Sequence, residues 1–261
     1  MKKQVLNKGF VEVIDSLGSD LTVVNSARVS FGKRKEVYDK SDRALVRYLA
    51  KHKHFSPFRH MVVQFHLKAP EFVMRQWYKH VVGIETTSSS ATKDHAWNEI
   101  SGRYVPVKDF YKPLVWRQQS TDNKQGSGDN MPDDLNIECQ KIFDNFMKNV
   151  EESYENLLKI GVAKEQARTI LPLNQYTEIY WTASFQAIMN FLELRTEKTA
   201  QWEIRQYAIT IKKLVSEIYP ETTDICGVWG TDFCTFLHFP THIEKSMNSA
   251  GFQPGIPPFP T

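Results

Sequence analysis

The sequence has few cysteines and no long apolar run. Cysteine occurs three times in 261 residues, at scattered positions, which argues against a disulfide framework and favours a reducing compartment. No apolar run approaches the roughly 20 residues that cross a bilayer, and the first ten residues lack the apolar core of a signal peptide. We therefore predict a cytoplasmic protein without a membrane partner.

Several motifs of nucleotide and metal chemistry are also missing. No G-x-G-x-x-G follows a predicted strand and no G-x-x-x-x-G-K-[ST] occurs, which argues against a Rossmann dinucleotide site and a P-loop. H-E-x-x-H, C-x-x-C and G-x-S-x-G are absent too, so zinc hydrolysis, thioredoxin chemistry and the hydrolase elbow lack support. His52 and His54 cannot share a helical face, so we predict no metal site.

The charge balance points away from nucleic acid. The formal net charge is +3 and 41% of the residues are hydrophobic, which is enough for one sizeable core. Nucleic-acid binders usually concentrate Lys and Arg in a denser patch. The mild basic excess suits a site for phosphorylated small molecules equally well.

Hydrophobic periodicity predicts an α+β fold, because helices and a few strands occur without tight β-α alternation. The strongest strand spans 61–69, where odd-numbered positions are apolar and Gln64, His66 and Lys68 face the other way. The polar segment 117–134 predicts an exposed loop. The expected strands are 10–15, 61–69 and 176–182. Helices are expected at 20–27, capped by Asp20, and at 70–80, with Pro70 in the first turn; further helices are expected at 163–170 and 185–194. Another helix, capped by Ser41 or Asp42, has Leu45, Tyr48 and Leu49 on one face, and the last helix carries Ile204 to Ile218. A long helix that ends at Gly161 has an apolar stripe made of Phe143, Phe146, Met147, Val150, Tyr154, Leu157 and Leu158.

Four groups of polar residues could carry chemistry, and each also has an ordinary structural explanation. Arg75 and Lys79 share a helical face and could bind a phosphate, or form a solvated basic face. The segment 98–104 (NEISGRY) combines a carboxylate, hydroxyl, glycine and guanidinium, but could be a polar turn leading into a strand.

Arg168 and Arg195 end apolar segments and could simply reach solvent. Asn190, one turn before Arg195, needs a partner that a ligand ring could supply. His54 lies in a cluster best explained as surface histidines, although its ordinary pKa would let it carry a proton.

Together these segments resemble the flavin-dependent thymidylate synthases, in the same order along residues 5 to 215. The matching segments are NSARVSF (25–31), HKHFSPF (52–58), FHLKAPEFVMRQW (65–77), NEISGRY (98–104), ARTILPLNQYT (167–177), MNFLELR (189–195) and AQWEIRQYA (200–208). The resemblance implies a single domain with a central, mostly antiparallel sheet flanked by helices. It also implies a homotetramer with active sites where subunits meet. The reaction would methylate dUMP to dTMP, with methylenetetrahydrofolate as co-substrate and FAD and NADPH as cofactors.

The resemblance also implies roles for particular residues. Arg195 would hold the uracil ring and stabilise negative charge on it, His54 and Tyr104 would line the folate and nicotinamide entry, and Ser101 resembles a serine once considered a nucleophile. A serine without an adjacent base is poorly activated, so we assign Ser101 to binding. The residues implied for dUMP are Gln76, Lys79, Glu99, Ser101, Gly102, Arg103, Arg168 and Arg195. The residues implied for FAD are Ser30, Ser56, Arg59, Lys79, His80, Val81, Ser184 and Asn190.

The sequence departs from the family pattern mainly on the FAD side. The signature Arg-His-Arg is replaced by Lys79-His80-Val81, which keeps one charge but loses the guanidinium fork. The serine at signature spacing is Ser89, but we favour Ser101 from its context, with an insertion at about 83–94 before it. Arg59 replaces a usual glutamate and Ser184 a common asparagine. We expect altered FAD binding and a retained dUMP site.

These patterns lead to a division of the chain and to two alternatives. We predict a catalytic domain at 1–239, with inserted loops at about 83–94 and 117–134, and a Pro-rich tail at 240–261. One alternative keeps the scaffold but hydroxymethylates dUMP. The other is a catalytically silent dUMP-binding protein.

Overall fold

The computed structural model describes residues 1–80, 96–121 and 124–227. Val81, Ser89, the predicted insertion at 83–94 and the tail at 240–261 lie outside the described residues, so the predictions for them stay predictions. The described chain forms a five-stranded sheet of order β1-β2-β3-β7-β4, antiparallel throughout, and a separate two-stranded sheet, β5-β6. The strands are β1 (Lys2–Val5), β2 (Gly9–Leu17), β3 (Val62–Pro70), β4 (Ala96–Glu99), β5 (Arg117–Gln119), β6 (Ser127–Asn130) and β7 (Tyr176–Ser184). The helices are α1 (Asp20–Arg28), η1 (Val29–Phe31), α2 (Lys40–Lys51), η2 (Ser56–His60), α3 (Glu71–Trp77), α4 (Asp133–Lys159), α5 (Lys164–Ala167), η3 (Arg168–Ile170), α6 (Phe185–Arg195), α7 (Trp202–Ile218) and α8 (Pro220–Gly227).

Strand β3 is the centre of the sheet and confirms the predicted period of two. Met61, Val63, Phe65, Leu67 and Ala69 are all 0% exposed, whereas the intervening polar side chains are only half-buried. Successive strand side chains point to opposite faces, so the apolar set faces the helices. The strands predicted at 10–15 and 176–182 are confirmed as β2 and β7.

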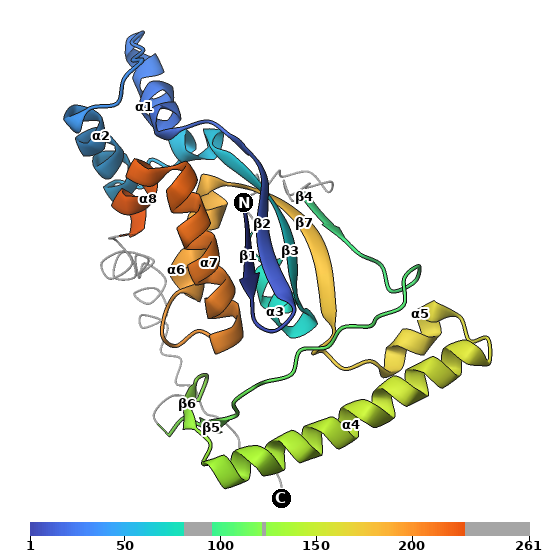
Figure 1. The fold of residues 1–261 in the computed structure, drawn as a ribbon. Coiled ribbons are helices and arrows are strands. Elements are labelled where there is room, and N and C mark those ends of the chain that lie inside the picture. The colour runs from blue at the N-terminus through green and yellow to red at the C-terminus, as the bar shows by residue number, and fades with distance from the viewer. Residues whose placement is uncertain (81–95, 122–123, 228–261) are drawn as a thin grey trace, which may run out of the picture.

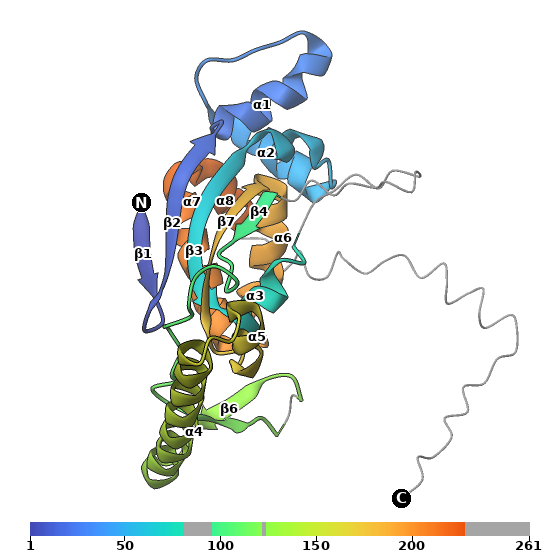
Figure 2. The same ribbon diagram turned by 90° about the vertical axis from the view of Figure 1, so that its right-hand side faces the viewer.

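Helices α6 and α7 cover one face of the sheet and α8 packs against α2 and α7, while the long helix α4 extends away from the sheet (Figures 1 and 2). The rings of Trp77, Trp181 and Phe191 pack together beneath the strands, with Trp77 and Phe191 stacked at 4.5 Å. In α7, the Tyr207 hydroxyl donates to the Lys68 carbonyl at 2.8 Å. The core therefore fixes α3, α6 and α7 relative to β3.

Gly9, the first residue of β2, lets α7 pack closely against the sheet. A Cβ at this position would overlap the Tyr207 hydroxyl and the carbonyl oxygens of Val5 and Lys68. No other residue lacks a Cβ, so a side chain here would push α7 off the sheet.

Several predicted helix boundaries are corrected by the structure. Ser19, and not Asp20, is the N-cap of α1. Asp39, and not Ser41 or Asp42, caps α2, because its carboxylate accepts hydrogen bonds from the backbone N–H groups of those two residues. Tyr48 was expected on the buried face of this helix but is 53% exposed, with its ring against His52.

Two further corrections concern α3 and α4. Pro70 is extended and precedes α3, which ends at Trp77 instead of near position 80. The helix expected through position 158 is α4, and Gly161 beyond it has φ of +91°, as its role in ending the helix requires. Phe146 was expected on the apolar stripe but is 53% exposed.

Outside positions 122–123, which the structure does not describe, the segment 117–134 is largely exposed as predicted, but its described backbone is not an irregular loop. It contains the β5-β6 hairpin, in which Arg117 pairs with Asn130, and the start of α4. Strand β1 and helix α8 were not anticipated either. No helix in the described ranges is both long and apolar enough to cross a bilayer.

Candidate active site

Five of the residues predicted to bind dUMP line one cavity of about 430 Å³ at the end of the sheet where β3 leads into α3. They are Glu99, Ser101, Gly102, Arg103 and Arg168. Glu71, Gln175, Tyr176 and Thr177 also line this cavity, and sequence reasoning missed them. The chemistry of this set, with two guanidinium groups, a hydroxyl and carboxylates, can hold an anion beside hydroxyl groups.

Strand β4 and the turn after it place this set. Glu99 pairs with Ile179 of β7, and the backbone N–H of Ile100 donates to the Glu178 carbonyl at 2.9 Å. The chain then turns, and the Ser101 hydroxyl accepts from the backbone N–H and from Nε of Arg103, both at 3.3 Å. The segment is thus a strand leading into a turn, the reverse of the alternative considered from the sequence.

A glycine and two carboxyl groups shape the cavity. A Cβ on Gly102 would lie 3.3 Å from Cδ of Arg168, so the arginine packs closely over the backbone. The Thr177 hydroxyl donates to Oε1 of Glu99 at 2.6 Å. Burial, followed by the nearby Glu99 carboxylate, raises the pKa of Glu71.

Three other predicted residues form a second cluster, which we call the Arg195 cluster: Gln76, His80 and Arg195. None of the three lines the cavity described above. Nε of Arg195 donates to Nε2 of His80 at 3.1 Å, and Nη1 of Arg195 donates to Oε1 of Gln76 at 3.4 Å. Helices α3 and α6 bring these side chains together, and the His80 ring packs edge-on against Phe191 at 5.2 Å.

The protonation state of His80 follows from this geometry. A guanidinium only donates hydrogen bonds, so Nε2 of His80 must accept and cannot carry a proton. Burial and then the charge of Arg195 lower the pKa of His80 to about 4. Burial also lowers the pKa of Arg195, but a guanidinium stays charged in proteins. The cluster therefore presents one fixed positive charge held by neutral partners.

The described residues predicted to contact FAD come from four parts of the chain: η1 (Ser30), η2 (Ser56 and Arg59), the segment after α3 (Lys79 and His80), and the cap and middle of α6 (Ser184 and Asn190). Ser30, Ser56, Arg59 and Lys79 are exposed. Ser184 caps α6, where its hydroxyl accepts from the Ala187 backbone N–H at 3.3 Å. His54 and Tyr104, expected at the folate and nicotinamide entry, are exposed as well.

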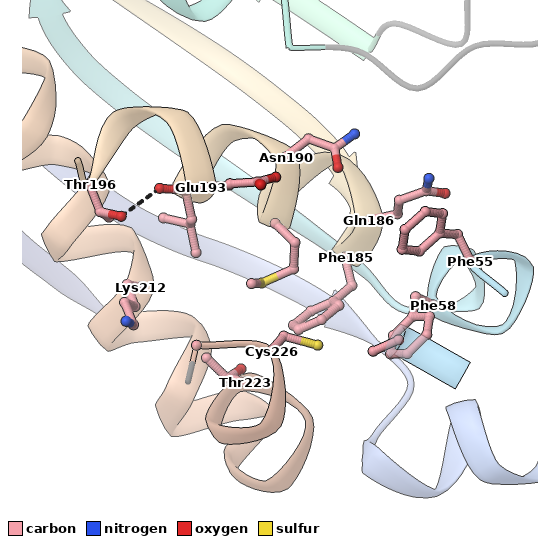
Figure 3. Close-up of a pocket in the computed structure, with 14 residues that line it drawn as sticks. Phe55, Phe58, Phe185, Gln186, Asn190, Glu193, Thr196, Lys212, Thr223 and Cys226 are labelled. Atoms are coloured by element: carbon pink, nitrogen blue, oxygen red, sulfur yellow. Dashed lines mark hydrogen bonds between the residues drawn. The ribbon is translucent and has the colours of Figure 1, made fainter. Parts of the chain in front are cut away.

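Asn190 lines a smaller cavity of about 60 Å³ between η2, α6 and α8 (Figure 3). Phe55, Phe58 and Phe185 supply apolar walls, and Gln186 adds a second amide. Oε1 of Glu193, on the same cavity, is buried without a hydrogen-bond partner, and burial raises the pKa of this carboxyl. The lining suits N–H and C=O groups such as a flavin carries, but about 60 Å³ is room for only about two water molecules, which is less than a flavin ring needs.

Comparison with solved structures gives the class of the fold. The chain is similar to the UMP/dUMP methylase PolB from Streptomyces cacaoi, solved with 5-Br UMP and with 5-Br dUMP. The TM-scores are 0.73 and 0.74 and the identities 29% and 30%, over 87% of this chain and 97% and 98% of that chain.

Sequence comparison then gives the family. A family model described as thymidylate synthase complementing protein matches residues 12–221. Flavin-dependent thymidylate synthases from Thermosipho melanesiensis and Thermotoga neapolitana are 41% and 42% identical, over 85% of this chain and 92% of each relative. The chain therefore belongs to the family of flavin-dependent thymidylate synthases.

Proposed function

We propose that this protein is a flavin-dependent thymidylate synthase that methylates dUMP to dTMP with methylenetetrahydrofolate, FAD and NADPH. Family membership supports the reaction, and the arginine-lined cavity is the observation that carries the substrate assignment. A nucleotide monophosphate needs charge-assisted donors for its phosphate, and Arg103, Arg168 and Ser101 offer them in one place.

In this proposal the two arginine sites act on opposite parts of the nucleotide. Arg103, Arg168 and Ser101 bind the phosphate, Glu99 accepts from the sugar, and Gly102 keeps the backbone close. Arg195 binds the uracil ring, where its fixed charge stabilises negative charge that develops on the ring. His80 and Gln76 hold the guanidinium in place, so little reorganisation is needed during the reaction.

The flavin side is proposed from the η2–α6 region. Asn190, Ser184 and Ser56 would hold FAD, with Arg59, Lys79 and His80 at its edges. FAD, reduced by NADPH, supplies the hydride when bound. His54 and Tyr104 would bind and orient the co-substrate at the entrance.

We further propose that complete active sites form between subunits of a homotetramer. Thr177, beside the large cavity, and Ser184, a proposed FAD contact, stand near opposite ends of β7, about 23 Å apart at about 3.3 Å per residue. The Arg195 cluster does not line that cavity. Both observations support a site completed by a second copy, which analytical ultracentrifugation and mixing of two inactive variants would test. Inactive variants of Arg168 and Arg195 are expected to restore activity when mixed, and an active monomer would contradict the assembly.

The decisive experiment is an omission assay on the purified protein. The protein is incubated with dUMP, methylenetetrahydrofolate, FAD and NADPH, each component is omitted in turn, and dTMP is quantified. We expect dTMP only when all four are present. Binding of dUMP without turnover would favour the silent alternative, and a product mass 16 above that of dTMP would favour hydroxymethylation.

A second substrate deserves a parallel assay, because the structural relative is named a methylase of both UMP and dUMP. The same assay with UMP would show whether this chain shares that breadth. A preference for dUMP by at least about tenfold, equivalent to about 1.4 kcal/mol, is expected for a thymidylate synthase.

A further inference from the structure

One residue outside the predicted site completes the hydrogen-bond chain of the Arg195 cluster. Gln201 lies at the N-cap of α7, and its Oε1 accepts from Nε2 of Gln76 at 2.6 Å. Gln76 in turn offers Oε1 to Arg195. The chain of contacts therefore runs from Gln201 through Gln76 to Arg195 and ends on His80.

The direction of every bond in this chain is set by Arg195. A guanidinium has no acceptor, so Gln76 must turn its carbonyl oxygen toward Arg195. Its amide nitrogen then points to Gln201, which must present an oxygen in return. If Gln201 presented a donor, two donors would face each other, and Gln76 would turn away from Arg195.

We propose that Gln201 is a positioning residue that holds the Gln76 amide in the orientation that Arg195 requires. Its catalytic meaning rests on the proposed function, but the orientation itself does not. Of the five N–H groups of the guanidinium, contacts with described residues use two. The remaining donors make no hydrogen bond to a described residue, and in this proposal they bind the ligand.

The β5-β6 hairpin holds Gln201 in place through the first turn of α7. Glu203 is 3% exposed, and its Oε1 accepts from Nη2 of Arg117 at 2.7 Å and from the Tyr111 hydroxyl at 3.2 Å. The Arg117 guanidinium also lies 5.2 Å from the ring centroid of Trp202. A segment that composition predicts as a loop thus fixes the helix start from which Gln201 reaches Gln76.

Three substitutions at position 201 test the order of donors and acceptors in the hydrogen bonds from Gln201 through Gln76 to Arg195. Gln201→Glu keeps an acceptor of the same length, Gln201→Leu removes it, and Gln201→Lys replaces it with a donor. Gln206→Leu, on the same helix, is the control for helix stability. Each variant is crystallised without cofactor, and dUMP binding is measured by calorimetry without FAD.

We expect Gln201→Glu to match the unmodified protein in both measurements. In Gln201→Leu and Gln201→Lys, the Arg195 to Gln76 contact should open beyond hydrogen-bond distance and dUMP affinity should fall by about fivefold or more, as for loss of one modest hydrogen bond. The lysine variant should be weaker than the leucine variant.

The proposal would be overturned if Gln201→Glu and Gln201→Lys changed the Arg195–Gln76 contact and dUMP affinity equally. It would also be overturned if neither Gln201→Leu nor Gln201→Lys changed them. If the protein makes no dTMP, the crystal structures of the variants still decide whether Gln201 orients Gln76. Failure of the proposed function and failure of this inference are therefore separate outcomes.

Discussion

Arg195 and Arg168 are both predicted dUMP contacts, yet the fold holds them in different ways. Arg195 is half-buried and donates to His80 and Gln76, and its pKa is lowered by burial. Arg168 is exposed, with its side chain packed over Gly102 beside an open cavity. One guanidinium is oriented before any ligand arrives, whereas the other is left free to close on one.

The difference teaches how one chain can serve two tasks with the same side chain. Stabilising charge in a transition state benefits from donors that are already fixed, because no reorganisation is then needed. Capturing a phosphate benefits from an accessible, strong donor pair. The comparison predicts that changes in the Arg195 cluster affect turnover and changes around the cavity affect binding.

The largest effect is expected from Arg195→Lys, which tests whether the half-buried arginine acts in turnover. The charge remains but the planar fork that directs Nε at His80 and Nη1 at Gln76 is lost, so kcat/KM for dTMP formation should fall by about 100-fold or more. Arg205→Lys is the matched control. Arg205 lies on α7, and its side chain donates to one described group, the Lys198 carbonyl in the turn before α7. Kinetics within threefold of the unmodified enzyme would show that Arg195 does not act on the reacting ring.

Arg168→Ala tests the open side and should change binding more than turnover. Loss of charge-assisted bonds to the phosphate should raise the Kd of dUMP by about 10- to 100-fold. The salt dependence of binding should also become shallower, because fewer ions are exchanged. Arg34→Ala serves as the control in the same calorimetric titration, because Arg34 is also exposed and lies far from Arg168 in the sequence. A drop confined to kcat would reverse the assignment.

The pH dependence of stability sharpens the contrast through His80. Its pKa is about 4 in the folded protein, below the ordinary 6.5, so folding favours the neutral ring. This contribution is complete above pH 6.5 and is lost as the pH falls toward 4. After allowance for partial exposure it amounts to about 2 kcal/mol.

Urea unfolding at pH 7 and pH 4.5 measures this loss. His80→Gln offers an acceptor that does not titrate, so its stability should fall less over the same interval. Parallel losses in the two proteins would mean that His80 does not sense pH in the cluster.

The smallest effect is expected from Lys79→Arg, which restores one guanidinium of the family signature. Lys79 is exposed, and an exposed interaction contributes at most about 1 kcal/mol. FAD binding should tighten by no more than about fivefold while dUMP binding stays constant. A change in dUMP affinity larger than the change in FAD affinity would favour the other role that the resemblance implies for Lys79, which is to bind dUMP.

The sequence predicted three of the five strands of the main sheet, β2, β3 and β7, and most helices, because their apolar residues follow strict periods. Strand β3 and helix α7 bury the residues that periodicity selects. The predictions of secondary structure failed where polar contacts, and not apolar periodicity, determine the local fold. The hairpin at 117–130 has no apolar alternation, and its position depends on the Arg117 to Glu203 ion pair, which joins distant parts of the chain.

The candidate site was predicted unevenly for the same reason. Resemblance selected Arg103, Arg168 and Arg195, but it gave no indication that they fall into two groups. Gln201 lies inside a matching segment, yet its role depends on a partner on α3 that spacing cannot reveal. Glu71 follows a proline at a helix start, where an acidic residue is ordinary, so no local signal marked it.

The central place of β3 also sets the order in which this chain can fold. Gln64 of β3 and Thr182 of β7 face each other although they are 118 positions apart. During synthesis β3 can pair with β2 early, but its other edge waits until β7 has left the ribosome. Pairings between such distant segments form slowly and leave a strand edge open to other chains. The protein is therefore expected to need protection from self-association during its own synthesis, well before any substrate matters.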